Sequence, residues 1–452
     1  RLIVVLNDNE MSISENVGSM ARYLAVVRAK PQYNKLKART ERILNKIPLI
    51  GSPIANIISK VKTDIKNSMY ESTFFEDLGF NYMGPIDGHN LEHLCEAFDS
   101  AKLLNEPVLL HFSTIKGKGY DFAEKSPSKY HGISKFDVNS GEYIESSTNF
   151  SNEFGKKLCE LAEKNDKGCA VTAAMSLGTG LKDFSEKYKN RFYDVGIAEQ
   201  HAVTFASGLA KGGMIPVFAV YSTFLQRAYD QLVHDGTLQN QKVIIGLDRA
   251  GFVGEDGVTH QGVLDVSFLN SIPDVTVYSP STYDRLKFDL ENSVNTSTNL
   301  TVIRYPRGGE YQLPENYKFS NNDYDYFECG NENLFVTYGR ISMNVLNAVN
   351  ELKKHGIIAS ALVLHKIKPI NNDVVSIAVN YKSVYFYEES VNSGSIGESF
   401  ADLLLAIGFK NNYSHIAVKD EFVPHASVDS LMKKYGLDTE SIVKNIMEKL
   451  NG

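Results

Sequence analysis

Short apolar runs that alternate with amphipathic stretches constrain the fold of this chain most. The runs are LIVVLN, PVLLHFSTI, KGCAVTAA, RFYDVGI, MIPVFAVY, KVIIGLDR, DVTVYSP, LTVIRYP, NLFVTYG and KSVYFYE. Most are continuously apolar, as expected for strands covered on both faces of a sheet. Stretches with helical periodicity separate them, at 91–104, 151–164, 199–211, 342–355 and 394–407. This alternation predicts an α/β fold of mostly parallel sheets flanked by helices, in which ligands bind beyond the carboxyl ends of the strands.

Two polar stretches, 137–150 and 310–333, indicate linkers between domains. The three domains that they predict, each with a mostly parallel sheet, are 1–136, 148–309 and 330–452. Residues 19–66 differ from their surroundings because they are basic, helical in pattern and interrupted by three prolines. We expect a mobile helical excursion there, either simply solvated or acting as a gate over an active site.

Composition narrows the class of protein. The chain has 452 residues, 43% of them hydrophobic, and its net charge of −7 argues against a general nucleic-acid binder. Its four cysteines lack CxxC spacing, which predicts reduced cysteines in a cytoplasmic protein rather than a zinc site or a disulfide framework. No apolar run reaches the ~18 residues of a membrane helix. The sequence begins within an apolar, strand-like run and has no initiator Met, so we expect a fragment that begins inside a domain.

Polar side chains follow the first predicted strand, in NDNEMSIS. Asn7, Asp8, Asn9 and Ser12 offer hard oxygens, which Mg²⁺ prefers, and this ion usually shares phosphate oxygens with its ligand. The alternative is a turn, because Asn and Asp at a strand end also bond to their own backbone.

In YDVGIAEQHAVT a strand runs into a helix with Glu199 and His201 in the first turn. A carboxylate at that position is stabilised by the helix dipole, so capping is one interpretation. A catalytic carboxylate is the other.

Six polar or aromatic side chains follow the strands MIPVFAVY and KVIIGLDR: Tyr221, Phe224, Arg227, Arg249, Asp256 and His260. Another strand end, in RYPRGG, presents Arg304 and Arg307. Arginine can grip a phosphate with two hydrogen bonds, and a histidine close to a carboxylate can move protons near neutral pH. A Gly-rich loop after another strand adds Lys116, Lys118, Tyr120 and His131, although it is not a Walker A motif. The alternative for any one of these residues is that it forms an ion pair on the surface and has no part in a site.

Seven motifs, taken in order, resemble the transketolase-like thiamine diphosphate family, and within it the enzymes that make 1-deoxy-D-xylulose 5-phosphate. The motifs are NDNEMSIS, GPIDGHN, KGKGY, VGIAEQHAVT, YSTFLQRAYDQ, LDRAGFVGEDGVTHQG and RYPRGG, and they span essentially the whole chain. The resemblance implies a carboligase that uses thiamine diphosphate and Mg²⁺ to condense pyruvate with D-glyceraldehyde 3-phosphate, releasing CO₂. Its product would feed non-mevalonate isoprenoid synthesis and the synthesis of thiamine and pyridoxal phosphate. The resemblance also implies a homodimer, and three domains: the remainder of a diphosphate-binding domain, a pyrimidine-binding domain and a C-terminal domain.

The resemblance further implies a role for each matching residue. Glu199 matches the catalytic acid that bonds to a pyrimidine nitrogen, and Phe224 the ring that packs on the pyrimidine. The other cofactor and metal matches are Tyr120, Asn9 and, through its carbonyl, Met11. The substrate pocket would contain Tyr221, Arg227, Arg249 and Arg307. The remaining catalytic candidates are His260 and His131 for proton transfer and Asp256 for orientation.

In the family, a GDG segment whose Asp is the principal carboxylate on the metal lies upstream of NDN. It is not in this sequence, and we therefore expect these 452 residues alone to be inactive. Within enzymes, the alternatives are a transketolase or the β subunit of a 2-oxoacid dehydrogenase. From a different class comes an inactive dimeric scaffold, against which the presence of Glu199, Arg227, Arg249 and His260 speaks.

Overall fold

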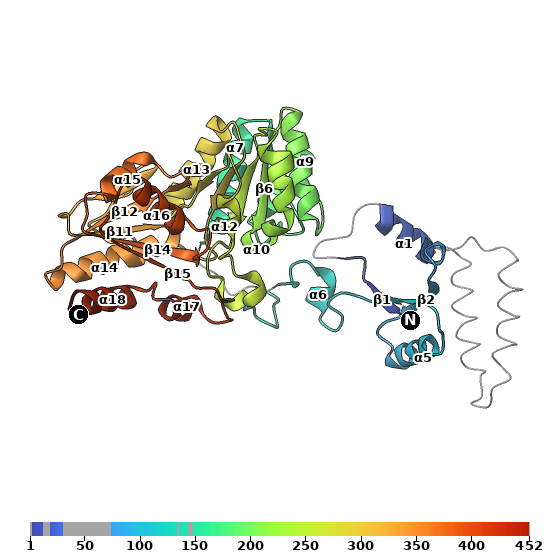
Figure 1. The fold of residues 1–452 in the computed structure, drawn as a ribbon. Helices are drawn as coiled ribbons and strands as arrows, with labels where there is room; N and C mark the ends of the chain where they lie inside the picture. The colour runs from blue at the N-terminus through green and yellow to red at the C-terminus, as the bar shows by residue number, and fades with distance from the viewer. Residues whose placement is uncertain (1, 12–18, 30–73, 133–134, 143–147, 452) are drawn as a thin grey trace, which may run out of the picture. The chain divides into compact units, whose positions relative to one another are not determined.

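The computed structural model describes residues 2–11, 19–29, 74–132, 135–142 and 148–451 of the chain (Figure 1). The chain divides into two compact units, Arg1–Ile144 and Glu145–Gly452, which we describe separately. No helix in the described ranges is long and apolar enough to cross a membrane.

The first unit contains a parallel sheet of three strands, in the order β1 (Ile3–Asp8), β3 (Val108–Ser113), β2 (Asn81–Asp87). The central strand β3 is buried along almost its whole length and forms a small core with helix α5 (Leu91–Lys102). Helix α5 begins where the Asn90 side chain accepts two backbone hydrogen bonds. The other helices in the described residues of this unit are α1 (Ser19–Ala29), α4 (Phe74–Asp77) and α6 (Asp121–Lys125).

The second unit contains a seven-stranded sheet, parallel except for one edge strand. Its order is β13 (Lys366–Lys368), β8 (Thr276–Tyr278), β9 (Thr301–Arg304), β7 (Ile244–Asp248), β6 (Ile215–Tyr221), β4 (Gly168–Thr172) and β5 (Phe192–Asp194). Helices α7 (Phe150–Lys164) and α13 (Tyr283–Thr296) pack in one core cluster of this sheet, and α9 (Glu199–Lys211) and α12 (Asp265–Asn270) pack in another. Both faces are therefore covered, which explains why its strands are continuously apolar. Three short helices complete it, α8 (Lys182–Lys187), α10 (Ser222–Leu225) and α11 (Tyr229–Gln231).

A five-stranded sheet occupies the C-terminal part of the same unit. Its order is β10 (Tyr324–Phe327), β12 (Ala359–Leu364), β11 (Asn333–Tyr338), β14 (Ser383–Val391) and β15 (Asn412–Val418), with β10 antiparallel. The flanking helices are α14 (Ser342–Lys354), α15 (Asn372–Ala378), α16 (Ile396–Ala406), α17 (Val428–Lys434) and α18 (Thr439–Asn451).

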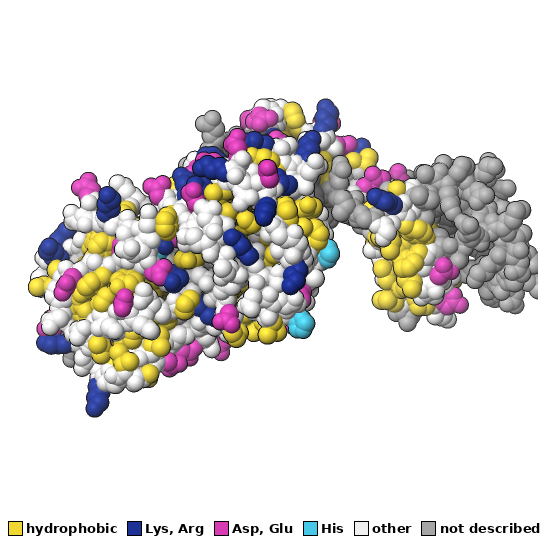
Figure 2. Space-filling view, turned by 90° about the horizontal axis from the view of Figure 1, so that it is seen from above, with side chains coloured by type: hydrophobic (Ala, Val, Ile, Leu, Met, Phe, Trp, Pro, Cys, Tyr) yellow, Lys and Arg dark blue, Asp and Glu magenta, His cyan; other side chains and the backbone are white. Residues whose placement is uncertain are grey.

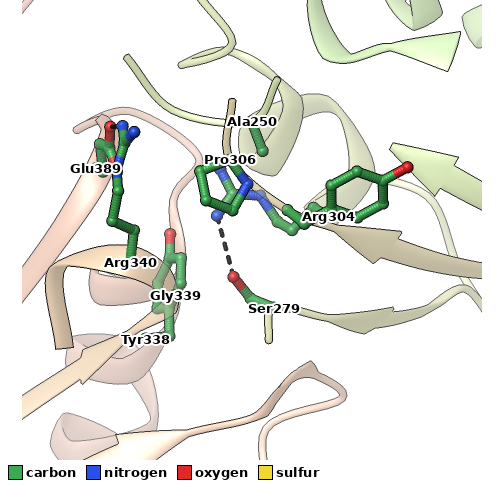
Figure 3. Close-up of a pocket in the computed structure, with 9 residues that line it drawn as sticks. Ala250, Ser279, Arg304, Pro306, Tyr338, Gly339, Arg340 and Glu389 are labelled. Atoms are coloured by element: carbon green, nitrogen blue, oxygen red, sulfur yellow. Dashed lines mark hydrogen bonds and ion pairs between the residues drawn. The ribbon is translucent and has the colours of Figure 1, made fainter. Parts of the chain in front are cut away.

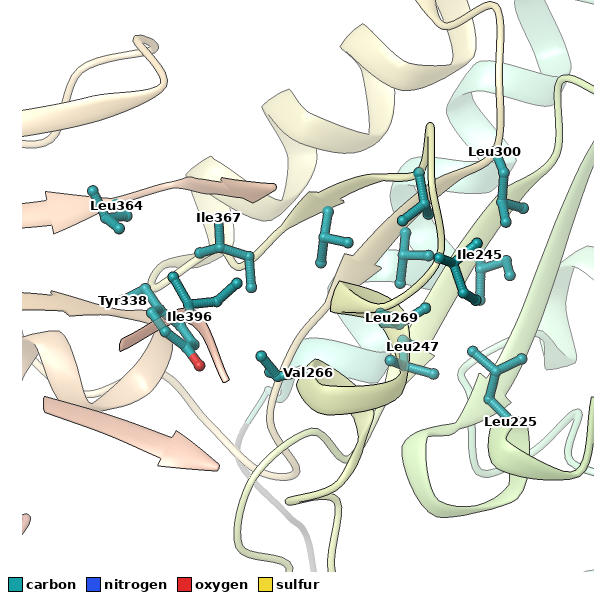
Figure 4. Packing of buried hydrophobic residues seen from close by; sticks show 14 of the residues in the cluster. Leu225, Ile245, Leu247, Val266, Leu269, Leu300, Tyr338, Leu364, Ile367 and Ile396 are labelled. Atoms are coloured by element: carbon teal, nitrogen blue, oxygen red, sulfur yellow. The ribbon is translucent and has the colours of Figure 1, made fainter. Parts of the chain in front are cut away.

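One hydrophobic core joins the two sheets of the second unit. Leu247 and Leu269 of the seven-stranded part belong to the same cluster as Tyr338, Leu364 and Ile396 of the C-terminal part (Figure 4). In addition, β13 comes from the C-terminal part of the chain but pairs with β8 of the seven-stranded sheet. The two sheets therefore form a single packed body.

The structure confirms the predicted fold class, and every apolar run named above contains a strand. Each helical stretch also contains a helix, from α5 to α16. The predicted domain boundaries stay predictions. Of the excursion at 19–66, the structure describes only α1, and the remainder lies outside the described residues.

Candidate active site

Four of the sequence-predicted residues of the second unit follow the carboxyl ends of strands in one sheet. Glu199 comes after β5, Tyr221 ends β6, Arg249 follows β7, and Arg307 lies just beyond β9. Strands β6, β7 and β9 are parallel neighbours. Their carboxyl ends lie along one edge, where ligands bind in sheets of this type.

Glu199 is the first residue of α9 and is only 1% exposed. Its Oε2 accepts no hydrogen bond from any residue that the structure describes, but it forms an ion pair with Nε of Arg227 at 3.4 Å. The helix takes no side-chain cap at Ala198. The capping interpretation is therefore weak, because the oxygen takes no hydrogen bond from the described residues, and a buried oxygen of this kind is costly unless a ligand supplies a donor.

Phe224 lies between two other rings of the predicted site. It stacks on Tyr221 with ring centres 5.9 Å apart, and His260 meets it edge-on at 5.3 Å. The hydroxyl of Thr259 lies 2.9 Å from Nδ1 of His260 and restrains that imidazole. Burial raises the pKa of Tyr221 to about 12, although the nearby Arg249 opposes the shift. Tyr221 is therefore a neutral phenol at physiological pH.

Arg249 and Arg307 converge on the carboxylate of Asp256. Arg249 pairs with one carboxylate oxygen, and Nη1 of Arg307 lies 3.1 Å from the other. All three side chains are partly exposed, at 19%, 31% and 20% for Arg249, Arg307 and Asp256. Two guanidinium groups share one carboxylate, so the cluster keeps a net positive charge that suits an anionic ligand.

Two residues behind this cluster were not predicted from the sequence. Asp248 is fully buried, its Oδ2 accepts a hydrogen bond of 2.6 Å from the Ser151 hydroxyl, and burial raises the pKa of its carboxyl to about 7. Its position at a strand end, directly before Arg249, was a usable signal. Gly178 packs so closely on Tyr221 that a Cβ at this glycine would overlap the phenol oxygen, which no sequence pattern reveals.

The first unit holds the remaining predicted residues. Asn9 and Asp8 each accept a hydrogen bond from the backbone two residues on, from Met11 at 3.0 Å and Glu10 at 3.1 Å, so the turn expected as an alternative is present. The Tyr120 hydroxyl donates to a backbone carbonyl at 2.8 Å. His131 is exposed. No group of three His, Cys, Asp or Glu able to hold a metal occurs in the described part of the chain, although amide and carbonyl ligands fall outside that search.

Three family models match the chain in sequence order. The model described as 1-deoxy-D-xylulose-5-phosphate synthase matches residues 1–114. The pyrimidine binding domain of transketolase matches residues 146–310, and the C-terminal domain of transketolase matches residues 327–442.

Two curated relatives carry the same name. The chain is 44% identical to the 1-deoxy-D-xylulose-5-phosphate synthase of Clostridium acetobutylicum over 452 residues, which cover 99% of this chain and 72% of the relative. It is also 44% identical to the synthase of Caldanaerobacter subterraneus subsp. tengcongensis, with the same two shares.

A solved structure of similar fold is titled "Split gene transketolase, inactive beta4 tetramer". It has a TM-score of 0.59 and 24% identity, and the likeness covers 68% of this chain and 99% of that one. At this identity the likeness supports the fold alone. The family models and the curated relatives together show that the chain belongs to the 1-deoxy-D-xylulose-5-phosphate synthase family.

Proposed function

We propose that this chain forms the pyrimidine-binding and substrate-binding part of an enzyme that condenses pyruvate with D-glyceraldehyde 3-phosphate. The products are 1-deoxy-D-xylulose 5-phosphate and CO₂, and the ketose phosphate enters non-mevalonate isoprenoid synthesis and the making of thiamine and pyridoxal phosphate. The observation that carries the proposal is Glu199, a buried carboxylate with an oxygen that accepts no hydrogen bond from a described residue and has an ion pair with Arg227 at 3.4 Å.

The residues of the second unit fit the pyrimidine ring of thiamine diphosphate. Glu199 would share a proton with a ring nitrogen, which fills the unused acceptor. Phe224 would pack on the flat heterocycle, as it already does on Tyr221. The bound cofactor supplies the nucleophilic carbon and the electron sink of the reaction.

The anionic substrates would be held by arginines. Arg249 and Arg307, already together at Asp256, suit the phosphate of the aldehyde, and Arg227, which is 48% exposed beside Glu199, suits the carboxylate of pyruvate. Tyr221 would donate a hydrogen bond, because its raised pKa keeps its proton in place. His260, restrained by Thr259, is our candidate for proton transfer to the new alcohol, with His131 as a second candidate.

In the first unit, Asn9 and the carbonyl of Met11 are the proposed ligands of Mg²⁺. The Asn9 amide oxygen has one lone pair engaged by the Met11 backbone, so one remains for a metal. Tyr120 is the proposed cofactor contact of the same unit. The expectation that the 452 residues alone are inactive stays a prediction.

We also infer a homodimer in the cytoplasm. Large hydrophobic side chains stay exposed in the second unit, among them Leu177, Ile197 and Val258, and hydrophobic side chains gather on the face in Figure 2. All four cysteines are free, which suits a reducing compartment.

The test measures ¹⁴CO₂ release from pyruvate, with and without glyceraldehyde 3-phosphate. It uses a holoenzyme in which these 452 residues are joined to the family's upstream GDG segment and supplied with thiamine diphosphate and Mg²⁺. We expect release that depends on the aldehyde and yields the five-carbon ketose phosphate. Two-carbon transfer between ketose and aldose phosphates without CO₂ would instead establish a transketolase, and no turnover of either kind would favour a scaffold.

A further inference from the structure

The loop that carries Arg249, one of the two proposed phosphate-binding arginines, is anchored in the C-terminal part of the chain. We call residues 249–262 the substrate loop. Its ends are joined by two hydrogen bonds between Gly251 and Gly262, at 2.7 and 2.8 Å. Phe252 is completely buried, belongs to the C-terminal core cluster and stacks on Tyr435 with ring centres 5.4 Å apart.

Arg340 and Glu389 grip the backbone of the substrate loop at Phe252. The Phe252 N–H donates to Oε1 of Glu389 at 2.5 Å, and Nη2 of Arg340 donates to the Phe252 carbonyl at 3.0 Å. The same guanidinium group pairs with Glu389 and reaches the Arg307 carbonyl at 3.5 Å. One buried ion pair, Arg340–Glu389, therefore holds the backbone N–H and carbonyl of Phe252. It also holds the backbone carbonyl of Arg307.

The loop also approaches this pair at van der Waals distance. Gly251 has a φ of 78°, and a Cβ at this position would overlap the Glu389 carboxyl. Further along, the Val253 N–H donates to the Gln261 side chain at 3.0 Å, and Nη1 of Arg307 donates to the Val253 carbonyl at 3.2 Å. A shift of the Arg340–Glu389 pair would thus be transmitted to both arginines that meet at Asp256.

The space beside the pair is too small to be a ligand site of its own. The cavity measures ≈ 10 Å³, the size of one water molecule, and is lined by Arg304 and Ser279 on one side and by Arg340 and Glu389 on the other (Figure 3). Arg304 is engaged there by Asp265 at 2.9 Å. Both terminal nitrogens of Arg340 have partners within the protein, whereas its buried Nε has none among the described residues. Because the adjoining cavity has room for one water molecule at most, the arrangement of Arg340 suits a positioning role.

We propose that Arg340 and Glu389 are positioning residues that hold the substrate loop, and through it set the preference of the enzyme for an aldehyde that carries a phosphate. The inference rests on the proposed function for the meaning of the phosphate. A buried ion pair by itself contributes little net stability, whereas its directional hydrogen bonds fix a geometry. The phosphate dianion depends on the placement of Arg249 and Arg307, and an uncharged aldehyde does not.

The test replaces the pair with neutral residues of similar length, R340M/E389M, which leaves no unpaired buried charge. In the holoenzyme, kcat/KM for glyceraldehyde 3-phosphate should fall by about tenfold or more, whereas kcat/KM for unphosphorylated glyceraldehyde should change by less than about threefold, because misplacement of a binding group affects only the substrate that uses it. Hydrogen exchange at the Phe252 amide should become about tenfold faster or more, while Leu247 in β7 stays protected.

The matched control is R285M/D289M, which removes another buried ion pair in the same unit, on α13. It should leave the ratio between the two aldehydes and the Phe252 exchange unchanged. If R340M/E389M does not fold, E389Q tests the same ratio with a neutral acceptor in place. A folded variant with an unchanged ratio, or with both aldehydes equally impaired, overturns the proposal. Should the wild type release no CO₂ with glyceraldehyde 3-phosphate, the proposed function fails, and the exchange measurement still decides whether the pair holds the loop.

Discussion

The guanidinium carbon of Arg249 lies 3.8 Å from the ring centre of Tyr221. Arg249 reaches this position from a backbone with a φ of 63°, which is uncommon for a residue with a side chain. It covers the phenol ring and pairs with Asp256 at the same time. A planar guanidinium can do both, and the ammonium group of lysine cannot.

Replacing Arg249 by lysine should therefore lower activity more than is usual for an exchange between two cationic residues. We expect R249K to lower kcat/KM for glyceraldehyde 3-phosphate by about 10- to 100-fold, because a hydrogen bond to a charged group contributes about 1.5–3 kcal/mol. Steady-state kinetics measure the loss. Arg191, which lies 4.5 Å from the Tyr188 ring centre away from the candidate site, supplies the control, and R191K should retain wild-type kinetics. Equal losses in both variants would mean that the effect is not specific to the site.

Replacing Glu199 by glutamine removes the carboxyl proposed to share a proton with the cofactor but keeps the shape of the side chain. We expect kcat to fall by about 100-fold or more, the usual contribution of an acid or base group. The melting temperature should change little, because relieving the burial of a charge offsets the loss of the 3.4 Å ion pair with Arg227. E153Q, in the first turn of α7, is the control for a buried helix-start carboxylate. Full activity in E199Q would contradict the assignment.

Asp248 should make the stability of the protein depend on pH. Burial raises the pKa of this carboxyl from 3.8 to about 7, so the folded state holds a proton that the unfolded state has lost between these values. Its contribution to stability then falls by about 1 kcal/mol per pH unit as the pH rises toward 7, and levels off above that. In urea unfolding, the free energy of unfolding of D248N should rise relative to that of the wild type as the pH increases from 5 to 7. D284N, with a 99% exposed side chain, is the control. A difference that does not vary with pH would refute the prediction.

A methyl group at Gly178 should displace Tyr221. We expect G178A to lower activity about tenfold or more, because the added Cβ overlaps the phenol oxygen and the ring carries part of the site. The double variant G178A/Y221F should recover folding stability relative to G178A, since it removes the overlapping oxygen, and a double-mutant cycle of melting temperatures measures this coupling. G208A, in α9 with open space around the glycine, should be neutral or stabilising by up to about 1 kcal/mol. Additive effects of the two changes would exclude the contact.

The sequence predicted the strands that are covered on both faces, because burial leaves an unbroken apolar run. It missed β2 and β15 for physical reasons: β2 contains Gly84 and Pro85, and β15 is only half-buried and carries polar residues. It missed α13 because its core face holds Arg285 and Asp289, a buried ion pair that disguises the amphipathic pattern.

Most of the candidate site was predictable residue by residue, since polar groups at strand ends in a parallel sheet gather at one edge. The partners of these residues were not. Arg249 and Arg307 are far apart in sequence and meet at Asp256 only because β7 and β9 are neighbours. The hold of Glu389 on Phe252 spans 137 positions and depends on packing between two sheets, which no local pattern encodes.

Strand β13 makes the C-terminal part of the chain a structural component of the neighbouring sheet. Because Lys366–Lys368 supply its edge strand, a chimaera that exchanges the C-terminal part for that of a relative would also replace the edge of the sheet that carries the candidate site. The Lys368 ammonium moreover donates to the carbonyls of Leu269 and Asn270 at the end of α12. Recombination between such enzymes should therefore succeed only where the two parents have matching residues at the β13–β8 pairing and at the contact of Lys368 with α12. This holds whatever the identity of their active-site residues.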